Sequence, residues 1–132
     1  MPKGLKVKST VPTPAEFRLL EVLWRLKEGT VEDILLAWGD NPPNYKTTQT
    51  LLRIMEAKRL ISHRLRGRAF VFQPKVEKEH VSRLSIESFL DRYFRGSRTE
   101  LLLNLLGDEQ IDSAELLELE ETIRRHRKAR QK

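Results

Sequence analysis

The sequence of 132 residues contains no cysteine, which excludes disulfide bonds, thiolate metal ligands and cysteine nucleophiles. It also contains no run of about 18 apolar residues, the length that a membrane-spanning helix needs, so we expect no membrane insertion. Residues 1–11 include lysines but lack the apolar stretch of a secretory signal, and we interpret them as a flexible basic tail. Together these absences favour a cytoplasmic location.

Patterns typical of enzymes and cofactor-binding proteins are also absent from the sequence. It has neither a glycine-rich phosphate loop nor a nucleophile placed beside a base. The three histidines, His63, His80 and His126, are far apart and do not have the spacing of a metal-ligand set. Glu77 and His80 have the spacing of a carboxylate–histidine motif, but di-iron helical bundles require two copies of it. We therefore predict no catalytic activity, no cofactor and no metal site.

Positive charge is concentrated in the first part of the chain. Residues 1–75 contain 14 lysines and arginines against 7 acidic residues, a net charge of +7. Residues 76–132 contain 11 against 12, a net charge of −1. An excess of positive charge confined to one region is typical of proteins that bind a polyanion. A basic protein without a nucleic-acid partner has the same composition, so charge alone does not decide between the two.

Two helices are predicted at the start of the N-terminal region from their capping residues. Thr13 and Glu16 have the spacing of a capping box, and helically spaced apolar residues follow. We expect this first helix to end at Gly29. Thr30 and Asp33 repeat the capping pattern, which predicts that a second, short helix begins there.

A third helix and a β-hairpin complete the N-terminal region. The breaker residues at 39–44 predict a loop, and a helix follows over about 44–59. Its first turns contain three threonines, which have low helix propensity, so we expect another requirement to select them. Residues 61–74 alternate between apolar and polar side chains around Gly67, the pattern of a two-stranded hairpin. Three helices followed by a hairpin predict a winged helix-turn-helix domain over residues 12–75.

Residues 76–132 are predicted to be helical, which makes the fold class mainly α with a small β-hairpin wing. One helix covers about 77–95, a short leucine-rich helix lies between Gly96 and Gly107, and the last begins at Asp112. A unit of this size rarely buries so many leucines alone, so we predict a helical dimerisation domain that forms a homodimer. The expected dimerisation residues are Phe89, Leu90, Tyr93, Leu101, Leu102, Leu105, Leu116 and Leu117. The alternative is that these helices fold back on the N-terminal domain as one monomeric core.

The polar residues of the third helix and the arginines of the hairpin are the candidate ligands for double-stranded DNA. At the start of a recognition helix, Gln49 can pair with adenine and a threonine can contact the thymine methyl. Lys46 can contact phosphate or guanine, and Arg53, one turn later, can reach a phosphate. Arginines at the hairpin tip are placed for the backbone or the minor groove. The full set is Lys46, Thr47, Thr48, Gln49, Thr50, Arg53, Arg64, Arg66 and Arg68. The alternative interpretation is a solvated polar helix face and a solvated turn.

These motifs resemble those of the penicillinase-repressor family, which includes the methicillin-resistance repressors and related copper-responsive repressors. The resemblance covers about residues 12–123 and rests on three segments in order. They are Thr13-Pro14-Ala15-Glu16 leading to Val22-Leu23-Trp24, then Tyr45-Lys46-Thr47-Thr48-Gln49-Thr50-Leu51-Leu52, and then Lys58 to Ile61. The resemblance implies a bacterial transcriptional repressor that binds a palindromic operator as a homodimer. It also implies that Lys46, Thr47, Gln49 and Thr50 face the DNA groove.

The resemblance also bears on regulation. In antibiotic-responsive members of the family a membrane sensor protease signals the drug, and the repressor is cut after an asparagine in its dimerisation domain. The matching position here is Asn104, although Leu105 stands where the family usually has an aromatic residue. The copper-responsive members carry a C-terminal cysteine cluster, which this sequence lacks, so copper sensing of that kind is excluded. Ile54, Met55 and Arg59 also depart from the family pattern, at positions that bear on packing and turn geometry.

Two functions of other classes are compatible with the same sequence. One is a winged helix that binds another protein, with its basic face merely solvated. The other is binding of structured RNA, although the major groove of A-form RNA is too narrow for the third helix. A steep salt dependence of duplex DNA binding distinguishes the DNA-binding function from the first alternative, and competition by duplex RNA tests the second.

Overall fold

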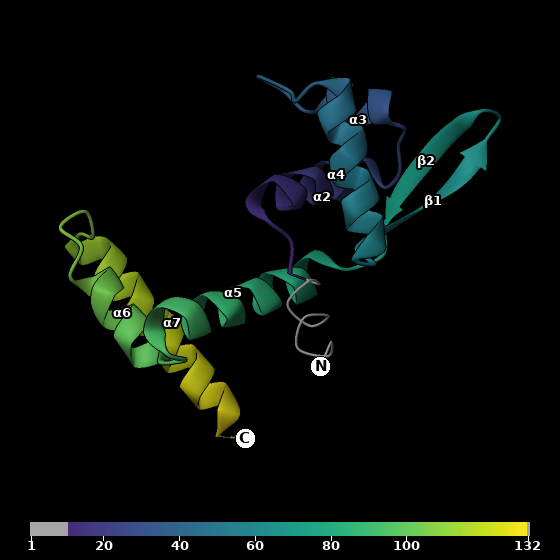
Figure 1. Ribbon diagram of the computed structural model, residues 1–132. Coiled ribbons are helices and arrows are strands. Elements are labelled where there is room, and N and C mark those ends of the chain that lie inside the picture. The colour runs from purple at the N-terminus through teal and green to yellow at the C-terminus, as the bar shows by residue number, and fades with distance from the viewer. Residues whose placement is uncertain (1–10, 132) are drawn as a thin grey trace. The chain divides into compact units, whose positions relative to one another are not determined.

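A computed structural model describes residues 11–131, which form six helices and one two-stranded antiparallel hairpin (Figure 1). In chain order the elements are α2 (Pro14–Leu26), α3 (Val31–Ala37), α4 (Tyr45–Ala57), β1 (Ile61–Arg66), β2 (Ala69–Pro74), α5 (Lys78–Phe94), α6 (Arg98–Leu106) and α7 (Ser113–Arg130). This composition confirms the predicted fold class. The predicted basic tail, residues 1–11, lies outside the described residues except for Val11.

The chain divides into two compact units within helix α5, between Ser88 and Phe89. The sequence had suggested a boundary after residue 75. The first turns of α5 belong to the first unit because Val81, only 1% exposed, lies in the core of that unit. Each unit is described separately below.

Helix α2 begins with the predicted capping box. The hydroxyl of Thr13 accepts a hydrogen bond from the backbone N–H of Glu16 at 3.2 Å, and Glu16 Oε1 accepts one from the N–H of Thr13 at 3.0 Å. The helix ends before Gly29, because Lys27 takes a left-handed conformation with φ of 77°. Gly29 instead exchanges backbone hydrogen bonds of 2.9 and 2.8 Å with Phe72, which join this loop to the hairpin.

Helices α3 and α4 also begin at the predicted residues. Thr30 accepts a hydrogen bond from the N–H of Asp33 at 3.1 Å, and Asn44 accepts one from the N–H of Thr47 at 2.7 Å. Helix α4 ends at Ala57 and contacts both α2 and α3 (Figure 1). The pair α3–α4 is therefore the helix-turn-helix, with α4 in the place of the recognition helix.

Strands β1 and β2 form the predicted hairpin, which we call the wing. The ladder pairs Ile61 with Pro74 at its base and Arg66 with Ala69 at its tip. Gly67, with φ of 66°, makes the turn in a left-handed conformation that costs glycine little.

The first unit has one continuous apolar core, to which all its helices and both strands contribute. The buried cluster consists of Leu19, Leu20, Val22, Leu23, Val31, Ile34, Leu52, Met55, Leu60, Ile61, Phe72 and Val81. Burial of whole apolar side chains is the main stabilising contribution in a small domain. The core therefore gives α4 and the wing a rigid support.

The second unit has well-capped helices but little buried surface. Ser97 accepts a hydrogen bond from the N–H of Glu100 at the start of α6, and Asp112 accepts one from the N–H of Glu115 at the start of α7. Neither α6 nor α7 contains a buried residue. Within residues 11–131 no helix is long and apolar enough to cross a membrane.

Candidate nucleic-acid interface

The N-terminal half of α4 presents a row of polar side chains at the surface of the first unit. Lys46, Thr47, Gln49 and Thr50 are exposed, and so is Arg53 one turn later. The hydroxyl of Thr50 donates to the carbonyl of Lys46 at 3.1 Å, which satisfies the hydroxyl within the helix. Neither Lys46 nor Arg53 forms an ion pair with any residue of 11–131. Their charges are therefore available to a polyanion.

Burial of Thr48 corrects the prediction that this residue faces DNA. Its side chain is 0% exposed, and its hydroxyl donates to the carbonyl of Asn44 at 2.9 Å. It belongs to the core face of α4 because it lies one helical turn before Leu52 and two before Met55, both of them buried. Ile54, an apolar residue of the same helix, is 42% exposed and lies outside the core. Core packing, not DNA reading, accounts for this one of the three threonines.

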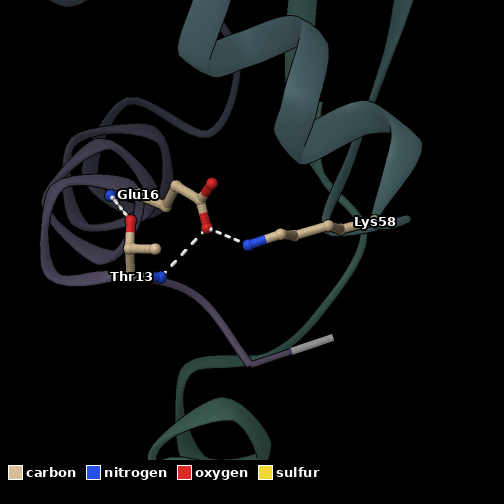
Figure 2. A network of polar contacts seen from close by, with 3 residues as sticks. All are labelled: Thr13, Glu16 and Lys58. Carbon is tan, nitrogen blue, oxygen red and sulfur yellow. Dashed lines mark hydrogen bonds and ion pairs between the residues drawn. The ribbon is translucent and has the colours of Figure 1, made fainter. Parts of the chain in front are cut away.

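A buried ion pair holds the C-terminal end of α4. Lys58 Nζ lies 2.8 Å from Glu16 Oε1, and the same oxygen accepts the N–H of Thr13 (Figure 2). The side chain of Glu16 is 3% exposed and that of Lys58 18% exposed. Because the pair joins the start of α2 to the end of α4, it helps to fix how the recognition helix lies on the core. Sequence reasoning identified Glu16 only as a capping residue, since its partner is 42 positions away.

The three arginines of the wing have different surroundings. Arg64, on β1, lies 2.7 Å from a carboxylate oxygen of Glu28. Both side chains are more than a third exposed, and a surface pair of this kind contributes about 1 kcal/mol at most, so Arg64 can exchange Glu28 for a phosphate. Arg66 and Arg68 flank the turn, are exposed and form no ion pair within residues 11–131.

A groove of about 510 Å³ runs between α4 and the wing. Gln49 and Arg53 line it from the helix, and Phe70 lines it from β2. His63 on β1 connects its two sides: Nδ1 lies 2.7 and 2.8 Å from the carboxylate oxygens of Glu56 on α4, and the ring stacks on Phe70 with centroids 4.3 Å apart. This contact, which the sequence did not reveal, sets the spacing between the recognition helix and the wing.

The predicted dimerisation residues are exposed with two exceptions. Leu90 is 3% exposed in the single chain, so it is already covered, and its assignment to an intermolecular contact is corrected. Leu101 is partly buried. The remaining residues have exposed fractions between 36% and 62%; they are Phe89, Tyr93, Leu102, Leu105, Leu116 and Leu117. Large apolar side chains exposed together are typical of surfaces that another molecule covers.

The predicted cleavage site lies near the end of α6. Asn104 is exposed and donates from Nδ2 to the carbonyl of Glu100 at 3.1 Å. The peptide bond to Leu105 lies within the regular helix, which ends at Leu106. Because a protease cleft accepts an extended peptide, cleavage here requires the last turn of α6 to open.

The fold and this surface can be compared with those of known proteins. The family model for penicillinase repressors matches residues 12–125. The penicillinase repressor of Bacillus licheniformis is 25% identical over 114 residues, which cover 86% of this chain and 89% of the relative. The methicillin resistance regulatory protein MecI of Staphylococcus aureus is 23% identical over 109 residues, 80% of this chain and 86% of the relative. The match to a solved structure of Bordetella bronchiseptica BpsR covers 92% of this chain and 83% of that chain, with a TM-score of 0.45 and 13% identity.

A helix-turn-helix with a basic wing, together with relatives that are named penicillinase repressors, defines the class of the protein: a DNA-binding transcriptional repressor of winged-helix type. Within that class, the chain belongs to the penicillinase repressor family, since the family model matches nearly its whole length. The resemblance inferred from the motifs around Thr13, Lys46 and Lys58 is thereby confirmed.

Proposed function

We propose that the chain represses transcription as a cytoplasmic homodimer bound to a palindromic operator. The first unit binds one half-site, and the second unit, which begins at Phe89, holds the two copies together. The observation that carries the proposal is the exposed polar row of α4 beside Arg66 and Arg68 of the wing, which form no ion pair within residues 11–131. A palindromic operator suits this arrangement because a two-fold dimer presents the same surface to each half-site.

The side chains divide into two roles on the DNA. Lys46, Thr47, Gln49 and Thr50 read base edges from the first turns of α4, where a recognition helix enters the major groove. Arg53 on α4 and the wing arginines Arg64, Arg66 and Arg68 contact phosphates. The Glu56–His63 contact supports this division, since it holds the wing beside α4 where the flanking backbone passes.

Substitutions at Gln49 and Arg66 test the two roles. Gln49→Ala is expected to cost about 1–3 kcal/mol on the cognate operator and to change binding to random duplex little, because only base reading is lost. Arg66→Ala is expected to weaken cognate and random duplex equally and to reduce the slope of log affinity against log salt by about one unit. Both effects are measured by fluorescence anisotropy at several salt concentrations.

The controls for this experiment come from the second unit. Gln110→Ala and Arg98→Ala remove the same chemical groups from exposed positions and are expected to leave both quantities unchanged. Unchanged sequence discrimination in both Gln49→Ala and Thr50→Ala contradicts the role of α4. If the wild-type protein shows no salt-dependent binding to duplex DNA, the protein-interaction module is favoured. If duplex RNA competes as well as operator DNA does, the RNA-binding function is favoured.

The proposal includes induction by a membrane sensor protease that cuts after Asn104. The cut separates α7 from the rest of the chain and divides the leucine-rich surface that the dimer uses. Each winged-helix domain then keeps its own base contacts, but its affinity for the operator falls because the two half-sites are no longer bound by one linked dimer. No movement of α4 is required.

Induction by cleavage is tested in the native host during exposure to a cell-wall antibiotic. We expect a fragment that ends at Asn104 to appear as the regulated genes are expressed, and to be absent in Asn104→Ala. Immunoblotting and mass spectrometry of the repressor measure both. Full derepression while the chain stays intact contradicts the cleavage mechanism and leaves the operator-binding proposal standing.

A further inference from the structure

Helix α7 separates its charges along its axis. The acidic residues all lie in its first half; they are Glu115, Glu118, Glu120 and Glu121. The arginines and the lysine all lie in its second half; they are Arg124, Arg125, Arg127, Lys128 and Arg130. All of these side chains are exposed, and none forms an ion pair with a residue of 11–131. One helix therefore presents two unneutralised surfaces of opposite sign.

The helix dipole accounts for only part of this separation. The dipole favours acidic residues in the first turn and basic residues in the last turn, and its effect falls off beyond those turns. Helix α7 has 18 residues, so Glu120, Glu121 and Arg124 lie near its middle, out of the dipole's reach. Positions four apart on a helix are neighbours, so Glu120 and Arg124 also favour each other across the change of sign. The outer charges, from Glu115 and Glu118 to Arg127 and Lys128, have no opposite charge at that spacing, and pairs within the helix do not neutralise them.

The same helix carries an apolar surface that its own chain leaves uncovered. Leu116, Leu117 and Ile123 are 37%, 56% and 50% exposed. No residue of α7 is buried. A helix whose apolar side chains stay this exposed gains most of its stability only when another surface covers them.

We propose that α7 pairs antiparallel with α7 of a second copy of the chain, so that the acidic half of each helix lies against the basic half of the other. The inference rests on the homodimer of the proposed function and adds the orientation of its helices. A two-fold axis perpendicular to α7 produces this pairing from identical chains and makes both ends of the contact equivalent. Parallel pairing would instead place like charges together along the whole helix. The charges select the orientation, and the leucines supply the contact area.

Charge reversal in either half tests the complementarity in the full-length protein. One variant combines Glu118→Lys, Glu120→Lys and Glu121→Lys, and the other combines Arg124→Glu, Arg127→Glu and Lys128→Glu. Each is expected to weaken its own homodimer at least about tenfold in sedimentation equilibrium, because like charges then face each other. An equimolar mixture of the two is expected to form heterodimers with the affinity restored. Glu109→Lys and Arg98→Glu are the matched controls, since they change the same charges outside α7 and should leave dimerisation unchanged.

Spin labels on single introduced cysteines test the orientation, because the natural chain has no cysteine to remove. Labels at Ser113→Cys, Glu121→Cys and Gln131→Cys mark the start, middle and end of a helix that is about 27 Å long at 1.5 Å per residue. Antiparallel pairing predicts the shortest distance between copies at Glu121→Cys and distances longer by roughly 10–25 Å at either end. A mixture of the Ser113→Cys and Gln131→Cys chains is expected to add a short distance. Pulsed electron paramagnetic resonance measures all four samples.

The outcomes separate this inference from the proposal on which it rests. A wild-type chain that stays monomeric overturns both. A dimer with equal distances at the three labelled positions, or one that both reversals leave intact, overturns the antiparallel pairing and keeps the homodimer. A second arm of the test measures binding to operator DNA. If the Arg124, Arg127 and Lys128 variant dimerises normally but loses salt-dependent affinity for duplex, the basic half contacts DNA instead, and the pairing is rejected.

Discussion

The two units of the chain differ in how far they bury their apolar side chains. In the first unit, helices, strands and a loop contribute to one cluster of buried residues. In the second, helices α6 and α7 contain no buried residue, and leucines such as Leu103 and Leu105 are more than half exposed. A closed core can stabilise a domain by itself, whereas an open apolar surface requires a partner. The core of the first unit is thus closed within a single chain, whereas the apolar surface of α6 and α7 stays open.

Local structure does not account for this difference. The helices of the first unit begin at Thr13, Thr30 and Asn44, whose side chains each accept a backbone hydrogen bond. Those of the second unit begin in the same manner at Ser97 and Asp112. A cap contributes only about 1 kcal/mol, so caps decide where a helix starts and not whether its unit is stable. The difference therefore arises from packing.

Truncation gives the largest expected effect on this comparison. A chain that ends after Ser88 keeps Val81 in the core, so we expect it to fold as a monomer. Its affinity for a full operator is expected to fall by roughly 10²–10⁴, because the second half-site is no longer tethered to the first. Sedimentation and anisotropy titrations measure the two quantities. A truncated chain that still dimerises and binds with undiminished affinity shows that the second unit is dispensable.

Removal of one leucine from each unit sharpens the comparison. Leu23 is 0% exposed, and Leu23→Ala is expected to lower the free energy of unfolding by about 2–5 kcal/mol because it leaves a cavity in the core. Leu105 is 54% exposed, and Leu105→Ala is expected to lower the free energy of unfolding of the monomer by less than about 0.5 kcal/mol. The same substitution is expected to raise the dissociation constant of the dimer instead. Urea denaturation at low protein concentration and sedimentation report the two effects. Equal losses of monomer stability would mean that the two units do not differ in packing.

The ion pair under α4 allows a buried charge to be compared with the helix caps of the two units. Glu16→Ala leaves Lys58 without its partner and is expected to cost about 3 kcal/mol, the lower end of the range for buried pairs because Lys58 stays partly exposed. Thr13→Ala, which removes only the cap, is expected to cost about 1 kcal/mol, and Asp112→Ala about the same in the second unit. Thermal and urea unfolding measure these losses. If Glu16→Ala costs no more than Thr13→Ala, the pair does not hold α4.

Much of the fold could be predicted from short-range patterns in the sequence. The capping residues predicted the starts of α2, α3 and α7, and the breaker residues at 39–44 predicted that of α4. The alternation around Gly67 predicted the wing. The first helix was predicted to end at Gly29 but ends three residues earlier, at Leu26, because Lys27 takes a left-handed conformation. No sequence rule marks a lysine for that conformation. Eight of the nine residues predicted for the candidate site are exposed, and only Thr48 faces the core.

Sequence by itself determined where the helices and strands begin and turn, because a cap or a turn depends on residues at most four positions apart. The sequence also contains the motifs of the penicillinase repressor family, whose model matches residues 12–125. Only the tertiary structure decided that Thr48 faces the core, that Ile54 faces solvent and that Lys58 reaches Glu16. A threonine or an isoleucine fits either side of a helix, and the neighbours that cover it come from segments distant in the chain. Burial is thus a property of the packed elements, and local sequence does not specify which of two similar faces they will cover.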